Sequence, residues 1–277
     1  MKVVVFLAKE DFTERQLKLI GPATFYNEVV KSEADLIEKC RDAEAVLATP
    51  KRVIQLTANF FNSLPKLKFV SVYATGCDWV DVSAAKVHGV EISYCPGYCT
   101  SAVAEWTITM LQKLCQPKGK TLGVIGLGRI GQAVAEKANK LGMKVIAWDR
   151  QQKSRVQVPL VKLLKESDVV SLHLELNDGT RGFIGKKEFE MIKQGAFLIN
   201  PSREGLVNGE ALKNALESGK LAGAAIDLDP GSKTILKNTL TTPHMAWKNP
   251  ESFLIGDKMF VQNLVKWRNG KPQNLLA

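Results

Sequence analysis

The sequence predicts an α/β protein with two parallel-sheet units. Short apolar runs alternate with longer amphipathic stretches, which is the pattern that strands and their covering helices leave in a parallel sheet. Turn-rich sequence and a helix-like segment separate a first series of such runs from a second one. The chain has 277 residues, enough to bury one large core or two modest ones. Two units on one chain is the simplest interpretation.

In the first series, apolar runs predict strands at residues 3–7, 45–49, 68–72 and 90–94. The segment 32–43 predicts a helix, because Ser32 can cap its first turn and the acid Asp35 follows three positions later. Charged residues follow the first run directly, so this run is too short for a signal-peptide core or a membrane span. We therefore expect a cytoplasmic protein without a membrane partner.

The second series begins after a helix predicted at about residues 101–114, between turn-rich segments at 96–101 and 116–120. Its predicted strands are residues 121–126, 144–148, 168–174, 196–200 and 221–228. No internal repeat or low-complexity tract interrupts this order.

Composition excludes several classes of protein. The formal net charge is +10, but the positive residues are scattered, so a solvated surface is favoured over a nucleic-acid-binding one. The five cysteines form no C-x-x-C pair and have no histidine partners at zinc-site spacing, so we expect reduced structural thiols and no metal site. They are Cys40, Cys77, Cys95, Cys99 and Cys115.

A glycine motif opens the second unit. Gly126, Gly128 and Gly131 form G-x-G-x-x-G between a predicted strand and a predicted helix, with Arg129 and Ile130 between the last two glycines. The first glycine makes the turn, the second lets the backbone approach a pyrophosphate, and the third lets the helix pack on the strand. The diphosphate of a dinucleotide then lies at the helix N-terminus.

The choice of dinucleotide depends on the end of the next strand. Asp149 stands there and can accept hydrogen bonds from the ribose hydroxyls, while its charge repels a 2′-phosphate. NAD is therefore predicted as the cofactor. Lys153 and Arg155 follow closely and could offset the repulsion, so NADP remains the second choice.

Several further motifs follow one another between Tyr73 and Trp247. They are ATGCDWVD (74–81), SAVAEW (101–106), GKTLGVIGLGRIG (119–131), ESDVVSLHLELNDGTRGFIG (166–185), GAFLINPSREGLVN (195–208), AGAAIDL (222–228) and TTPHMAW (241–247). With these motifs in this order, the chain resembles the D-isomer-specific 2-hydroxyacid dehydrogenases. The resemblance implies a Rossmann-like nicotinamide-binding domain, residues 99–249, inserted in a flavodoxin-like substrate domain formed by residues 1–98 and 250–277.

The resemblance also implies roles for individual residues. Arg203 matches the catalytic arginine that binds the substrate, although on its own it would be read as a surface cation. Backbone N–H groups near Thr75 and Gly76 match the cradle of the substrate carboxylate, although Gly76 would equally suit a plain turn. The cofactor-binding positions are Gly126, Gly128, Arg129, Ile130, Gly131, Asp149, Pro201 and Asp227. Asp227 has capping of a helix or loop as its alternative role.

Of the three histidines, His244 matches the proton-transferring residue of the family. Its ordinary pKa of about 6.5 suits proton exchange with a substrate near neutral pH. His173 lies in an apolar strand and is interpreted as a hydrogen-bonded scaffold residue, whereas His88 precedes a glycine and indicates a helix C-terminus.

The chain departs from the family in two places. Where the family has a glutamate that orients the histidine, this sequence has Ser232, and Asp229 is the acid available in that loop. We favour that Asp229 does not replace the glutamate, because Pro230 and a short loop restrict it. The arm that pairs subunits in the family is also reduced, to residues 115–119, so a homodimer rests on the helix 101–114 alone.

The prediction is thus an NAD-dependent oxidoreductase of a small 2-oxo or 2-hydroxy acid. Catalysis is assigned to Arg203 and His244, and Asp229 is the candidate for the third residue in place of the usual glutamate. Two alternatives stay open: an NAD(H)-sensing binding protein without activity on the same scaffold, and a dehydrogenase of an oxyanion other than a carboxylate.

Overall fold

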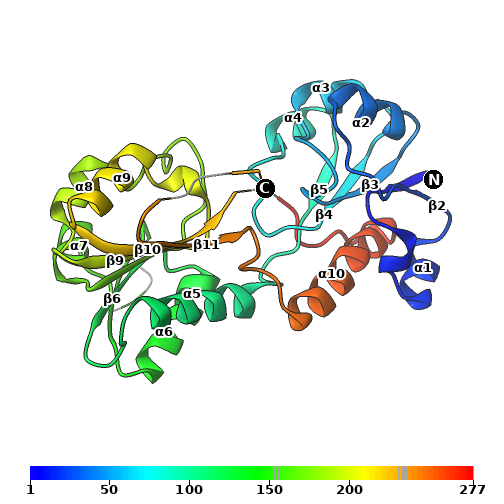
Figure 1. The fold of residues 1–277 in the computed structure, drawn as a ribbon. Coiled ribbons are helices and arrows are strands. Elements are labelled where there is room, and N and C mark those ends of the chain that lie inside the picture. The colour runs from blue at the N-terminus through cyan, green and yellow to red at the C-terminus, as the bar shows by residue number, and fades with distance from the viewer. Residues whose placement is uncertain (152–153, 155, 230, 233–235, 277) are drawn as a thin grey trace. The chain divides into compact units, whose positions relative to one another are not determined.

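The computed structural model describes residues 1–151, 154, 156–229, 231–232 and 236–276, and these form two compact units (Figure 1). Unit 1 comprises Met1–Tyr98 and Phe253–Ala277, and unit 2 comprises Cys99–Ser252. Each unit has one sheet whose described strands pair in parallel, with helices on both faces. The predicted fold class, two parallel-sheet α/β units, is confirmed.

The sheet of unit 1 has the strand order β2-β1-β3-β4-β5. Its strands are β1 (Val3–Val5), β2 (Ala23–Phe25), β3 (Ala45–Ala48), β4 (Phe69–Val72) and β5 (Glu91–Ser93). Its helices are η1 (Lys9–Asp11), α1 (Glu14–Ile20), α2 (Glu33–Cys40), α3 (Ala58–Asn62), α4 (Val82–Val87) and α10 (Pro250–Arg268). In Figure 1, α2, α3 and α4 cover one face of the sheet and α1 and α10 the other. The predicted cap of α2 is present, because the Ser32 hydroxyl accepts from Asp35 N at 3.2 Å.

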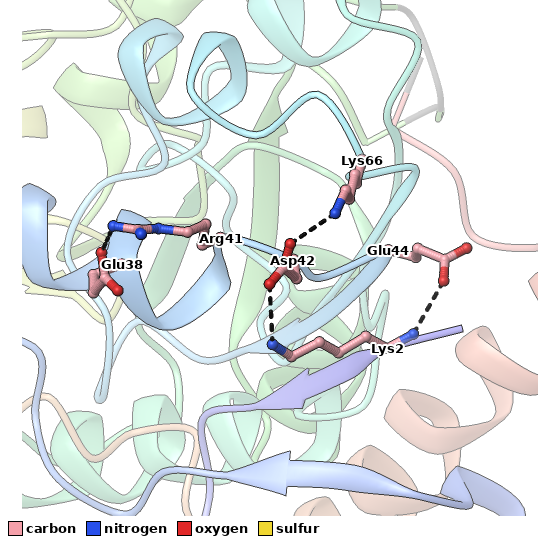
Figure 2. Close-up of polar contacts among 6 residues, drawn as sticks. All are labelled: Lys2, Glu38, Arg41, Asp42, Glu44 and Lys66. Atoms are coloured by element: carbon pink, nitrogen blue, oxygen red, sulfur yellow. Dashed lines mark hydrogen bonds and ion pairs between the residues drawn. The ribbon is translucent and has the colours of Figure 1, made fainter.

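A group of exposed polar contacts lies at the amino ends of β1 and β3 (Figure 2). Asp42 contacts Lys66 Nζ at 2.8 Å and Lys2 Nζ at 3.7 Å. The backbone N–H of Lys2 donates to Glu44 at 3.1 Å, and Arg41 pairs with Glu38. Exposed pairs of this kind contribute little to stability, because water screens their charges. The contacts of Asp42 and Glu44 join chain segments at the amino ends of the strands, opposite their carboxyl ends.

The sheet of unit 2 has the strand order β11-β10-β9-β8-β6-β7. Its strands are β6 (Thr121–Ile125), β7 (Lys144–Trp148), β8 (Val169–Leu172), β9 (Ala196–Asn200), β10 (Leu221–Leu228) and β11 (Thr239–Pro243). Its helices are α5 (Thr100–Leu114), α6 (Arg129–Lys140), α7 (Leu160–Glu166), α8 (Lys186–Met191), η2 (Glu204–Leu206) and α9 (Gly209–Glu217). The helices α5 and α6 cover one face, and α7, α8 and α9 cover the other (Figure 1).

This strand order reverses once. The chain runs from β6 outward to the edge strand β7 and then returns to β8 on the other side of β6. At such a reversal, here between β6 and β8, the connections that follow the two strands run to opposite faces of the sheet. Ligands bind beside this point, at the carboxyl ends of the strands. The glycine motif follows β6 at this point.

Within the described residues, no helix is both long enough and apolar enough to span a bilayer. Of the five cysteines, four are buried and Cys115 is half-buried.

Candidate active site

The glycine loop has the geometry that each glycine predicts. Gly126 has φ +93°, and a Cβ there would lie 2.6 Å from the carbonyl oxygen of His173. At Gly131 a Cβ would lie 2.0 Å from the Gly126 carbonyl oxygen, so only glycine lets α6 approach the loop this closely. A Cβ at Gly128 would meet nothing within 4 Å. This open side of the loop is the room that a diphosphate requires, so the residues present fit a dinucleotide.

The carboxylate of Asp149 is held against this loop by two backbone N–H groups. One carboxylate oxygen accepts from Leu127 N, within the loop, at 2.7 Å, and the other accepts from Gln151 N at 2.9 Å. Asp149 follows β7 and therefore holds a negative charge beside the N-terminus of α6, which begins at Arg129. A second negative group at the same place, such as a 2′-phosphate, would be repelled. Lys153 and Arg155, which could offset this repulsion, lie outside the described residues.

Three of the predicted site residues follow three neighbouring strands. Arg203 comes shortly after β9, Asp229 directly after β10 and His244 directly after β11. Because β9, β10 and β11 are adjacent and parallel, their carboxyl ends bring these residues together. In the register, Leu228 lies opposite Pro243, so Asp229 and His244 begin neighbouring loops.

The loop that carries His244 is anchored by Asp227. This carboxylate is 2% exposed and accepts from Thr242 Oγ1 at 2.5 Å, from Met245 N at 2.8 Å and from Ala246 N at 2.8 Å. Asp227 therefore caps the histidine loop, which was its alternative role. Its predicted place in the cofactor-binding site stays a prediction, as does that of Pro201.

Two tryptophans extend this anchor. Trp106 on α5 donates from Nε1 to Thr242 Oγ1 at 3.1 Å, and Trp247 donates from Nε1 to the His244 carbonyl oxygen at 3.1 Å. The backbone of His244 itself has φ +49°, in the left-handed region. A non-glycine residue is held there only when its surroundings determine the conformation. These hydrogen bonds supply that constraint.

The electrostatic surroundings of His244 lower its pKa from the ordinary value. Burial of the ring is the main cause, and the positive charge of Arg203 adds to it. The charges of Asp227 and Asp229 and the backbone of Leu228 oppose the shift. The ring therefore holds a proton less readily than a free imidazole at neutral pH.

Asp229 makes a contact that the sequence did not indicate. Its Oδ2 accepts from Glu204 N at 3.0 Å, while Asp229 N donates to Glu204 Oε2 at 2.8 Å. Burial raises the pKa of Asp229, and the guanidinium of Arg203 opposes this shift. Among the described residues, Asp229 Oδ1 and His244 Nδ1 are both buried without a hydrogen-bond partner. The only sequence signal for Glu204 was its place directly after Arg203.

Arg203 is half-buried at the start of η2. Its backbone carbonyl accepts from Asn200 Nδ2 at 2.7 Å, and its Nη1 donates to the Ser202 carbonyl oxygen at 3.1 Å. The side chain of the buried Asn200 thus fixes the turn that presents the guanidinium. A planar, permanently charged group placed this way suits a carboxylate or a carbonyl oxygen.

The predicted carboxylate cradle belongs to unit 1. Thr75 and Gly76 follow β4, and Thr75 Oγ1 donates to the Cys95 carbonyl oxygen, which follows β5, at 3.0 Å. This bond joins the carboxyl ends of two neighbouring strands. Both residues are partly exposed, and their contact with a substrate stays a prediction.

The other two histidines have structural surroundings. His173 follows β8, its Nε2 contacts Ser171 Oγ at 2.7 Å, and burial lowers its pKa to about 3. His88 is the C-cap of α4, where its N–H contacts the Ala84 carbonyl oxygen at 3.1 Å. In the part of the chain that is described, no group of three or more His, Cys, Asp or Glu residues could hold a metal ion.

Comparison with known proteins agrees with this fold. Residues 101–246 match the family model described as "D-isomer specific 2-hydroxyacid dehydrogenase, NAD binding domain". The chain is 31% identical to the glycerate dehydrogenase of Methylorubrum extorquens, covering 99% of both proteins. It is 31% identical to the hydroxypyruvate reductase of Blautia hydrogenotrophica, covering 100% of this chain and 99% of the relative. A solved structure from Thermus thermophilus matches with a TM-score of 0.88 at 28% identity and covers 100% of both chains.

Proposed function

Since this chain belongs to the D-isomer specific 2-hydroxyacid dehydrogenase family and is an oxidoreductase with a nicotinamide cofactor, we propose that it reduces a small 2-oxo acid with NADH. The observation that supports this proposal best is the order of residues along the carboxyl ends of the strands. Arg203, Asp229 and His244 follow three adjacent strands, and the glycine loop follows β6 in the same sheet.

In this proposal, the chain's own groups bind and orient the reactants. The glycine loop and the N-terminus of α6 receive the diphosphate, and Asp149 receives a ribose hydroxyl. When bound, the cofactor supplies a hydride to the carbonyl carbon. Arg203 holds the carboxylate or the carbonyl oxygen through its guanidinium, and backbone N–H groups near Thr75 and Gly76 bind the carboxylate.

His244 then supplies the proton. Its imidazolium donates to the carbonyl oxygen, so that a 2-oxo acid, NADH and one proton give a 2-hydroxy acid and NAD⁺. In the opposite direction the neutral ring accepts the hydroxyl proton. Asp227 and Asp229 are the acids near this ring, and the negative charge of each favours the imidazolium.

We propose glyoxylate or hydroxypyruvate as the substrate, because similar relatives are a glycerate dehydrogenase, a hydroxypyruvate reductase and a glyoxylate reductase. Either acid bears a carboxylate next to a carbonyl and little else, which suits a site whose assigned groups recognise only those two functions. The preference for NADH over NADPH rests on the charge of Asp149 beside the glycine loop.

The test is a panel of 2-oxo acids with NADH, followed at the nicotinamide absorbance, for the wild type, His244→Ala and the control His88→Ala. We expect turnover of a two- or three-carbon 2-oxo acid and a loss of about 10²–10⁴-fold in His244→Ala only. Wild-type protein that binds NADH but reduces none of the acids would favour the binding protein without activity. Turnover of another oxyanion alone would favour the third interpretation.

A further inference from the structure

We infer that Glu204 is a positioning residue of this active site, which holds Asp229 so that one carboxylate oxygen is available to His244. The inference rests on the function proposed for His244. Glu204 is placed outside the catalytic residues because no contact to a reacting group is assigned to it.

The contact between Glu204 and Asp229 is reciprocal. The Glu204 carboxylate accepts from the backbone N–H of Asp229 at 2.8 Å, and the Asp229 carboxylate accepts from the backbone N–H of Glu204 at 3.0 Å. Each side chain therefore fixes the backbone of the other residue. Because Glu204 directly follows Arg203, the turn that carries the guanidinium and the loop that leaves β10 are held as one piece.

A third residue completes this arrangement. The second carboxylate oxygen of Glu204 accepts from Ser232 Oγ at 3.0 Å, and Ser232 N donates to the Asp229 carbonyl oxygen at 3.0 Å. Both Glu204 oxygens thus accept from the loop after β10. Such an acid is suited to holding the loop.

The consequence for His244 depends on the Asp229 carboxylate oxygen that Glu204 does not bind. Its Oδ2 is bound by Glu204 N, while its Oδ1 is buried and, among the described residues, has no hydrogen-bond partner. The same holds for His244 Nδ1. A buried polar atom without a partner destabilises the folded chain, so a structure keeps one only if other contacts hold it in place. Glu204 supplies those contacts.

The other charged groups around the ring do not offer such an oxygen. Asp227 accepts from Thr242 with one oxygen, which also accepts from Met245 N, and from Ala246 N with the other, so its charge is directed at the loop backbone. Arg203 is positive and disfavours the imidazolium. The Leu228 backbone also hydrogen-bonds the ring and favours the imidazolium. Asp229 Oδ1 is therefore the charged acceptor toward which a protonated Nδ1 of His244 can turn when the ring takes up its proton.

The substitutions Glu204→Ala and Glu204→Gln separate the effect of the Glu204 hydrogen bonds from the effect of its charge. Alanine removes both side-chain bonds to the loop. Glutamine keeps them, because its amide oxygen can accept from Asp229 N and its amide nitrogen can donate to Ser232 Oγ. The matched control is Glu188→Ala, since Glu188 is another half-buried acid of unit 2 that accepts from a backbone N–H, that of Gly185 at 3.0 Å.

The first readout is the pKa of His244, measured by NMR titration of the imidazole signals. The chain has only three histidines, so His88→Asn and His244→Ala suffice to assign them. We expect Glu204→Ala to lower the His244 pKa by about one unit, because Asp229 no longer faces the ring. Glu204→Gln should recover most of this shift, and Glu188→Ala should show none.

The second readout is kinetic. In Glu204→Ala, kcat for reduction at neutral pH should fall about ten-fold, in step with the pKa, while KM for the 2-oxo acid changes less than about three-fold. Ser232→Ala, which removes one of the two side-chain bonds, should shift the His244 pKa in the same direction by a smaller amount. This variant keeps the test available if Glu204→Ala does not fold.

Two results would overturn the inference. One is a Glu204→Ala protein with a lower melting temperature but the wild-type His244 titration and pH–rate profile, which would mean a purely structural acid. The other is an equal shift of the His244 pKa in the alanine and glutamine variants, which would mean that the charge of Glu204 matters and its hydrogen bonds do not. Since the NMR titration needs no turnover, either result is distinct from failure of the proposed function, which His244→Ala decides.

Discussion

Thr242 and Asp227 are joined by a hydrogen bond of 2.5 Å from the threonine hydroxyl to the carboxylate, next to two backbone N–H groups that bind the same acid. This contact lies near the carboxyl ends of β10 and β11, since Asp227 and Thr242 are partners in the register of these strands. One buried carboxylate thus fixes the strand end from which His244 emerges.

We therefore expect Asp227→Asn to loosen the histidine loop. An amide NH₂ would face donors where the carboxylate has an oxygen, which should cost about 1–3 kcal/mol in the free energy of unfolding. The kcat for reduction should fall with it, and urea denaturation and steady-state kinetics measure the two effects. Thr242→Val, which removes a single donor, should cost less. A variant with wild-type stability and kcat but weaker NADH binding would instead support the predicted place of Asp227 beside the nicotinamide.

The position of Asp149 leads to a prediction on the cofactor. Because its carboxylate is bound to Leu127 N in the glycine loop, its charge cannot easily move away from an incoming 2′-phosphate. NADH should bind at least ten-fold more tightly than NADPH, a difference of about 1.4 kcal/mol, in calorimetric titrations. Asp149→Ser should narrow the gap. Equal affinities in the wild type would mean that a nearby cation, Lys153 or Arg155, neutralises the phosphate.

Arg203 allows a comparison of two cations. Arg203→Ala should lower kcat/KM about 10²–10³-fold while leaving NADH affinity nearly unchanged, because the guanidinium binds the substrate. Arg203→Lys should recover little, since an ammonium group cannot form the paired hydrogen bonds of a guanidinium. Arg181, exposed in the same unit, provides the control Arg181→Ala. Near-normal kcat/KM in Arg203→Ala would return this residue to the role of a surface cation.

His173 should limit the stability of the protein in acid. Its pKa is lowered to about 3 in the folded chain, whereas an unfolded histidine titrates near 6.5. Below about pH 6.5 the unfolded state takes up a proton that the folded state does not, so stability falls as the pH falls. The loss is at most about 1.4 kcal/mol per pH unit between these two values.

Urea denaturation between pH 8 and pH 4 measures this dependence. His173→Gln keeps a polar group near Ser171 but cannot take up the proton, so its stability should vary less across this range. His88→Asn, at the exposed end of α4, serves as the control and should retain the wild-type slope. An unchanged slope in His173→Gln would assign the acid sensitivity to other groups.

Most of the fold could be predicted because buried parallel strands are continuous apolar runs. The strands missed were β2 and β11, which lie at the edges of their sheets and are partly exposed. Thr239–Pro243 reads as polar sequence because one side of this strand has no neighbour to bury it. Apolar patterning carries no signal for such strands, and only their pairing with β1 and β10 defines them.

The candidate site divides in the same way. The loop at Gly126 follows from local geometry, because a tight turn from strand to helix requires glycine. Arg203 and His244 were assigned through the family resemblance, since β11, the strand that His244 follows, was not predicted. The pair Glu204–Asp229 could not, because the two residues are 25 positions apart and meet only after β9 and β10 have paired. The capping role of Asp227 was one of two alternatives, and choosing it required the distances to Met245 and Ala246.

The last prediction concerns the pH dependence of the reaction. Reduction needs the imidazolium of His244, and the pKa of this ring is lowered by burial and by Arg203. The rate of reduction should therefore fall as the pH rises through a value below about 6.5, while the rate of 2-hydroxy acid oxidation, which needs the neutral ring, should rise through the same value. Pro230, which was expected to restrict Asp229, lies outside the described residues.

Asp229→Asn decides whether this acid contributes. Its charge opposes the lowering of the His244 pKa, so the amide should move the reduction profile further toward acid and lower kcat at neutral pH. The measurement is a pH–rate profile of the wild type, Asp229→Asn and His244→Ala with the best substrate of the panel. The control is Asp178→Asn, an exposed acid of the same unit. If Asp229→Asn follows the wild-type profile, nothing in this loop replaces the family's glutamate and His244 works alone; if His244→Ala keeps most of the rate, the proton comes from another group.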